Sequence, residues 1–251
     1  MSAAVVIART GRAEWARIWS VRSSWLFVLA TAVAVLGIGA IAGTDASAPP
    51  PGATAWDGSR PCALFALFGI LAMAVVTSTA DHGTRGIVPT VQWTPRRGVL
   101  LAARAGVIVA VMTLLASVLV VVATVVVWAL KGGVGLPAGE GARTVGDLAF
   151  VYASGALLAV GLGLVTHSTA AALVIVIALV LVLPLLVAQL PFGWTTEIAT
   201  HLPGSGALFL IFGEGPSDDM TTTSARLTMA VWAVAALTAG GWRLLRTDVD
   251  R

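Results

Sequence analysis

The sequence predicts an all-α integral membrane protein with six transmembrane helices. Of its 251 residues, 58% are hydrophobic and only 11% are charged, whereas a soluble domain typically carries about 25% charged residues. Six apolar runs approach or exceed the length of about 20 residues that a helix needs to cross the hydrocarbon core. Charged residues gather between these runs. The expected spans cover residues 25–43, 62–80, 101–130, 148–165, 169–190 and 227–242, so residues 25–251 form one six-span domain.

Residues 1–24 are expected to form an amphipathic helix in the membrane interface. They contain four arginines and one acid, and Trp15 and Ile18 fall on one helical face, opposite Arg9 and Arg17. Tryptophan is favoured at the depth of the lipid headgroups, and arginine beside a span favours the cytoplasmic side. Such a helix serves either as an anchor and topology signal or as a brace for a partner protein, and both interpretations stay open.

The first half of the chain alternates spans with polar connections. The run at 25–43 is expected to be a retained span rather than a cleaved signal peptide, because the region before it is too long for one. The proline-containing segment 44–61 then forms an external loop. The third run, 101–130, exceeds the usual crossing length, so it tilts or begins below the membrane. A glycine-rich loop at 131–147 leads to the fourth span.

The second half contains signals for close packing and for a bend. Three glycines in the fourth span allow neighbouring helices to approach closely. A very short inner turn at 166–168 follows, and Pro184 predicts a kink in the fifth span. The external segment 191–224 includes the apolar hexamer Ala207–Phe212. Because six residues cannot cross a bilayer, this piece is expected to be re-entrant or interfacial.

The basic residues orient the spans. With both termini in the cytoplasm, the inner segments hold 11 of the 15 basic residues, and the opposite orientation would reverse that bias. The preference for arginine, alanine, valine and glycine indicates a bacterial chain, so the expected location is the inner (plasma) membrane. The four basic residues placed outside are Arg60, Lys131, Arg143 and Arg226.

The sequence lacks groups that several other classes of protein need. No expected span has an ionisable residue in its interior, which argues against carriers coupled to protons or ions. Lys131, the single lysine, does not lie in a phosphate-binding loop, so any ATPase is a separate chain. His82, His167 and His201 occur singly, so neither a metal site nor enzyme activity is expected. The net charge of +3 comes from arginines beside apolar runs, which indicates topology rather than nucleic-acid binding.

The stretch 77–104, between the second and third spans, is polar and carries four arginines against one acid, which places it in the cytoplasm. It contains an acidic residue, a His-Gly-Thr-Arg run and a Thr-Pro-Arg-Arg turn, in which Pro95 suits the first turn of a helix. In this pattern the chain resembles the six-helix membrane subunits, or permeases, of ABC exporters of the second type. The resemblance implies that the segment docks on a partner ATPase through Asp81, His82, Thr84, Arg85, Thr94, Pro95, Arg96 and Arg97.

A few hydroxyl groups lie within the expected spans. Thr113, Ser117 and Thr124 recur at i, i+4 and i+11 on one face of the third span, and Thr77 lies near the end of the second. These side chains either line a path for an amphiphilic substrate or form hydrogen bonds between helices and to their own backbone. The hydrogen-bonding role is the favoured interpretation.

The resemblance and the topology together imply the permease subunit of an ATP-driven exporter, of a kind associated with drug or antibiotic resistance. It would move an amphiphilic small molecule, peptide or lipid outward. Two copies, or one copy and a paralogue, would enclose the path within the lipid. Two copies of a separate ATPase would bind ATP and Mg beneath them, and this chain would hold no cofactor. The alternative is a six-span immunity or regulatory protein that binds a toxin or lipid and transports nothing.

Overall fold

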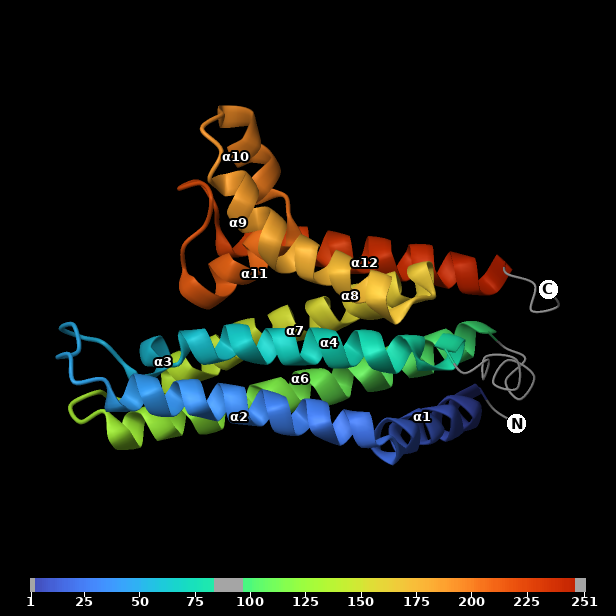
Figure 1. Cartoon of the computed structure of the whole chain (residues 1–251), viewed down its shortest axis with the longest axis horizontal. Helices are drawn as coiled ribbons and strands as arrows, with labels where there is room; N and C mark the ends of the chain where they lie inside the picture. Colours follow the sequence, from blue (N-terminus) through green and yellow to red (C-terminus); the bar gives the residue numbers. More distant parts are fainter. Residues whose placement is uncertain (1–2, 84–96, 247–251) are drawn as a thin grey trace.

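A computed structural model describes residues 3–83 and 97–246 of the chain, and these residues form helices and no strand. Figure 1 shows the helices in the colours of the sequence. In chain order they are α1 (Ala3–Ser20), α2 (Arg22–Thr44), α3 (Ala55–Gly58), α4 (Arg60–Gly83), α6 (Arg97–Leu130), α7 (Ala138–Thr166), α8 (Thr169–Ile177), the π-helical segment η1 (Ala178–Val182), α9 (Leu183–Ala188), α10 (Gly193–Thr200), α11 (Pro203–Phe212) and α12 (Thr222–Arg246).

Six helical stretches in the described residues are long and apolar enough to cross a membrane, which confirms the predicted all-helical, multi-pass chain. Five of them lie close to the predicted spans. The fourth differs, because α7 begins at Ala138 and the predicted loop at 131–147 shortens to seven residues before it. The first turns of α7 contain glycine and charged side chains, so their hydropathy is too low for the sequence to predict them as part of a span. Glu140 nevertheless suits the first turn, where the helix dipole favours a negative charge.

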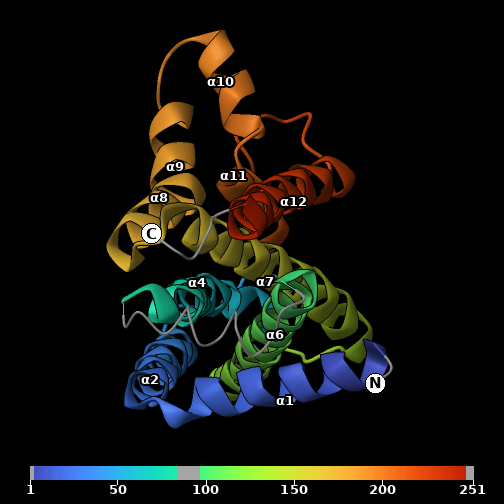
Figure 2. The ribbon, with the colours of Figure 1, turned by 90° about the vertical axis from the view of Figure 1, so that its right-hand side faces the viewer.

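The axes of the long helices α2, α4, α6, α7 and α12 are roughly aligned, whichever way the chain runs along them (Figure 1). The start of α1, the end of α12 and the helix ends that border residues 84–96 lie at one end of the molecule, called here the termini end (Figure 1). The connections 45–54 and 131–137 lie at the other, called here the distal end. The N-terminal helix α1 runs across the termini end and packs mainly on α6 (Figure 2). At this end α1 therefore lies across the direction of α2 and α6, against which it packs.

The core lies around α4 and α7. Of their most apolar stretches 67% is buried, against 33% or less in the other four long helices. Tyr152 of α7 is fully buried, and its hydroxyl donates to the Ala63 carbonyl of α4 at 3.2 Å. Leu67 and Ile70 of α4 and Met112 of α6 fill the same core. α4 therefore contacts α2, α6, α7, α8 and α11 with most of its surface.

Small residues bring α7 and α12 together, in the most extensive contact between two described helices. A Cβ atom added at Gly161 would overlap the backbone carbonyl of Ala236, and one at Gly240 would lie 2.6 Å from the Gly161 carbonyl oxygen. In lipid, helices associate through such close van der Waals contact because the surrounding tails are as apolar as the side chains. The glycines of the fourth span thus permit the close packing that the sequence predicted.

Near Pro184, where a bend was expected, the helix contains the π-helical segment η1, which ends two residues before the proline. Because proline has no N–H, it cannot donate a helical hydrogen bond to the Val180 carbonyl. A Cβ at Gly204 of α11 would overlap that same carbonyl, so α11 packs closely against η1 at this point. With ten residues, α11 is about 15 Å long, half the thickness of a hydrocarbon core of about 30 Å. It contains the predicted apolar hexamer Ala207–Phe212.

Candidate functional site

The predicted docking stretch begins and ends on described helices. The backbones of Asp81 and His82 belong to the last turn of α4, and Arg97 is the first residue of α6. The structure therefore describes the two helix ends that border the stretch. The other docking residues, Thr84, Arg85, Thr94, Pro95 and Arg96, lie outside the described residues.

A buried ion pair joins one of these helix ends to α1. Arg104, two turns into α6, has a side chain only 3% exposed, and the Glu14 side chain of α1 is 7% exposed. The Arg104 Nη2 atom lies 3.3 Å from Glu14 Oε1, and its Nε atom lies 3.4 Å from both carboxylate oxygens. A guanidinium group that faces a carboxylate with two donors is held in orientation as well as in place. This pair fixes α1 against α6.

A second arginine joins α1 to the other helix end. Arg17, one turn after Glu14, lies 3.7 Å from the Glu14 carboxylate and donates through Nη2 to the Thr77 carbonyl of α4 at 2.9 Å. Glu14 therefore faces two guanidinium groups, and the four residues connect α1, α4 and α6. We call Glu14, Arg17, Thr77 and Arg104 the α1 junction. The Glu14 carboxylate thus lies within ion-pairing distance of both arginines, and the Glu14–Arg104 pair is buried.

The last helical turns of α4 extend these contacts to two more helices. Thr77 offers its carbonyl to Arg17, as described. The Ser78 side chain packs against α7, where a Cβ at Gly163 would overlap its Oγ atom. The Thr79 hydroxyl lies 2.7 Å from that of Thr169, the first residue of α8. Three consecutive residues thus contact three different helices, directly before the predicted docking stretch.

The sequence signal for the α1 junction was weak. Glu14 is the only acid in the first 44 residues, and it shares a helical face with Gly11 and Ile18. The sequence prediction counted Arg104 and Arg17 as topology signals and placed Arg17 on the polar face of α1. The structure instead turns Glu14 and Arg17 toward the bundle. A lone carboxylate on the apolar side of an amphipathic helix is the feature that could have indicated a buried partner.

The turn between α7 and α8 adds a titratable group at the same end. His167 caps α7 in the left-handed conformation, with φ of 54°. Arg243 of α12 donates to the carbonyl of Val165 in the last turn of α7. Partial burial, and to a lesser degree the nearby Arg243 guanidinium, lower the pKa of His167 below its ordinary value of 6.5.

Acidification should therefore weaken the fold at this turn. Between the lowered pKa of the folded chain and 6.5, the unfolded chain binds more protons, so stability falls as the pH falls through this window. His167→Asn, which keeps a residue that tolerates the left-handed conformation, should lack this part of the acid sensitivity. Thermal unfolding of both proteins in detergent, from pH 7.5 down through the pH window, measures the difference. Equal slopes in both proteins would contradict the assignment.

The four hydroxyls proposed for a substrate path have different surroundings. Thr77 bonds to the carbonyls of Met73 and Ala74 in its own helix. Thr124 donates to Ser59 at 2.7 Å and to its own helix at Val120. The oxygens of Thr113 and Ser117 are buried and have no hydrogen-bond partner among the described residues. Thr77 and Thr124 thus form the hydrogen bonds between helices or to their own backbone that were the favoured interpretation. Thr113 and Ser117 form no such bond among the described residues.

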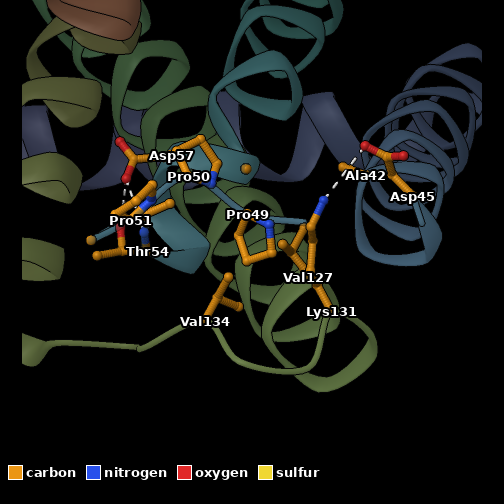
Figure 3. A pocket seen from close by; sticks show the side chains of 13 residues that line it. Ala42, Asp45, Pro49, Pro50, Pro51, Thr54, Asp57, Val127, Lys131 and Val134 are labelled. Carbon is orange, nitrogen blue, oxygen red and sulfur yellow. Dashed lines mark hydrogen bonds and ion pairs between the residues drawn. The ribbon is translucent and has the colours of Figure 1, made fainter. Parts of the chain in front are cut away.

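The distal end contains an open hollow of about 540 Å³ between the connections 45–54 and 131–134. Figure 3 shows Lys131 reaching toward Asp45 on one side, while Thr54 and Asp57 lie on the other. The Lys131 ammonium is 3.5 Å from the Asp45 carboxylate. Hydrogen bonds from Ser47, with a smaller effect of Lys131, lower the pKa of Asp45. The charges that line this hollow therefore occur in pairs.

The contacts of the α1 junction hold α1 against α4 and α6. Within residues 3–83 and 97–246 no group of three or more potential metal ligands is present. Neither a protein-family model nor a curated protein matches the chain.

Proposed function

We propose that this chain is the permease subunit of an ATP-driven exporter. The observation that carries the proposal is the α1 junction, because it ties α1 to both helices that border the stretch 81–97. A polar, arginine-rich stretch between two spans is a suitable surface for a partner protein. The α1 junction connects α4 and α6, the two helices that border this stretch, through α1. A partner that binds the stretch could therefore move several helices together.

The proposed mechanism is mechanical. A push on residues 84–96 acts on the end of α4 and the start of α6 together, since both are continuous with that stretch. Arg104 and Arg17 carry the displacement to α1, and Ser78 and Thr79 carry it to α7 and α8. Packed helices shift between discrete arrangements rather than deforming continuously. The bundle therefore changes its tilt as a unit when the partner hydrolyses ATP.

The charge distribution supports a placement in the membrane. We assign the termini end to the cytoplasm, because its segments hold 11 of 15 basic residues. α1 then lies in the inner interface, across the ends of the spans. The helices α10 and α11 form the external, partly re-entrant element between the fifth and sixth spans, in the plasma membrane of a bacterium.

The partners follow from what the chain lacks and what it resembles. A second copy of the chain or a paralogue would complete the path, and two copies of an ATPase would supply ATP and Mg binding. The transported substrate is an amphiphilic small molecule, peptide or lipid that moves outward.

Charge reversal in the docking stretch tests the proposal. Arg85→Glu and Asp81→Lys should leave membrane insertion intact but weaken assembly with the ATPase, or uncouple hydrolysis from export. Breaking a buried interfacial charge pair from one side typically costs about 2–5 kcal/mol, whereas an arginine that only contacts anionic lipid contributes about 1 kcal/mol. The matched control is Arg143→Glu, an exposed arginine at the distal end, which should change none of these properties.

The assay compares complex yield, ATPase rate and export for the three variants in the same membranes. Wild-type assembly and transport in both docking variants would show that the stretch is not the ATPase contact. Recovery of a bound toxin or lipid with no ATPase in any preparation would favour an immunity or regulatory protein.

A further inference from the structure

A second, smaller cavity lies at the distal end, where α3 and α4 meet α7, α11 and α12. Its volume is about 290 Å³. Figure 1 shows the starts of α3 and α4 close to α11 at the end away from the termini. Two arginines hold its walls together: Arg60 donates to the carbonyl of Phe212, and Arg226 of α12 pairs with Asp147 of α7. The cavity is therefore built from five elements that are fixed to one another.

The charges of this cavity are not balanced. Its lining includes three carboxylates, of Asp57, Glu140 and Asp147, and one cation, Arg60. Arg60 binds Asp57 at 2.7 Å, and Asp147 is paired with Arg226. Glu140 accepts a hydrogen bond from the Thr54 hydroxyl at 2.9 Å but has no cationic partner among the described residues. One full negative charge thus remains uncompensated in the cavity wall.

Aromatic side chains complete the lining. Trp56 is 8% exposed and Phe209 lies on the wall formed by α11. An ammonium group with attached methyl or methylene groups gains from both the face of an aromatic ring and a nearby carboxylate. The segments predicted to lie outside the membrane carry 8 of the 12 acids and 4 of the 15 basic residues, so their summed field also attracts cations. The larger hollow at the same end has no unpaired carboxylate among the described residues that line it, because its Asp45 is paired with Lys131 and its Asp57 with Arg60.

We propose that this cavity binds a small organic cation, a protonated or quaternary amine, with its charge at Glu140 and its apolar part against Trp56 and Phe209. The site does not depend on the exporter function, because the cavity is complete within one chain. The same ammonium chemistry occurs in a free amine and in the headgroup of a lipid at the membrane surface.

The test measures saturable binding of radiolabelled choline to the full-length chain, purified in detergent. Glu140→Gln should weaken binding about tenfold or more, because it removes the uncompensated charge, and Glu140→Asp should weaken it less. Glu197→Gln, an exposed acid that does not line the cavity, should bind like wild type. Equal thermal stability of the variants shows that any loss is not due to unfolding.

Binding in nanodiscs separates the two sources of the cation. If the natural ligand is a headgroup, discs of phosphatidylethanolamine should block choline binding, whereas discs of phosphatidylglycerol should not. If it is a free amine, both kinds of disc should permit binding. The absence of saturable binding in detergent, or the same affinity in wild type and Glu140→Gln, would overturn the proposal.

Discussion

Replacing Glu14 with alanine should lower the free energy of unfolding of the purified chain by about 3–5 kcal/mol. The change removes the carboxylate that faces the buried Arg104 guanidinium and the Arg17 guanidinium. Removing one partner of a buried ion pair is costly because the other charge keeps its desolvation penalty. Unfolding in mixed detergent micelles measures the effect. The matched control is Arg12→Ala, an exposed position on the same helix, which should change stability by less than about 0.5 kcal/mol.

A double variant shows that the loss comes from the unpaired charge. Glu14→Leu combined with Arg104→Met replaces both charges with apolar side chains of similar length. Such a replacement is often neutral or stabilising, so the double variant should recover most of the stability that Glu14→Ala loses. A Glu14→Ala protein as stable as wild type would show that the ion pair does not hold α1 in place.

Gly161→Ala should be the most damaging single-methyl change in α7. Its Cβ would overlap the backbone carbonyl of Ala236, and backbone atoms cannot rotate away as a flexible side chain can. The helices α7 and α12 would have to separate along their most extensive contact, at a cost of about 3 kcal/mol or more. The same substitution at Gly146, which has open space around it in the same helix, should instead stabilise the chain by up to about 1 kcal/mol.

The free energies of unfolding of the two alanine variants are compared in micelles. Because both variants gain the same methyl group in the same helix, the difference between them reports the α7–α12 contact and not helix propensity. If Gly161→Ala matched Gly146→Ala in stability, α7 and α12 would not be packed as closely as described.

The six long helices could be predicted because lipid imposes a simple requirement: a crossing helix must be apolar over about 20 residues. The start of α7 could not be predicted in this way. Residues 138–147 are helical because they pack at the distal end, where Trp56 lies directly over Gly141. Hydropathy contains no information about such a contact between distant segments. The kink at Pro184 was predictable from local chemistry, but the π-helical segment before it and the close approach of Gly204 to that segment were not.

The candidate site was predicted only in part. The polar stretch between the second and third spans was evident from its charges, but the α1 junction beneath it was not. Arg104 resembles the other arginines that flank spans, and only the path of α1 across the termini end brings Glu14 to it. In the same way, the sequence presents Glu140 as one of several balanced loop charges. The structure pairs Asp57 with Arg60 and Asp147 with Arg226, so that Glu140 is the acid left without an ion pair among the described residues of the small cavity.

The contact between Glu14 and Arg104 joins residues that are 90 positions apart, and this separation sets an order of events during biosynthesis. At a translation rate of about 5–20 residues per second, Glu14 leaves the ribosome about 5–20 seconds before Arg104. During that interval the carboxylate must remain in contact with water or headgroups. The contact between the N-terminal helix and Arg104 therefore forms only after the first turns of the third long helix have been made.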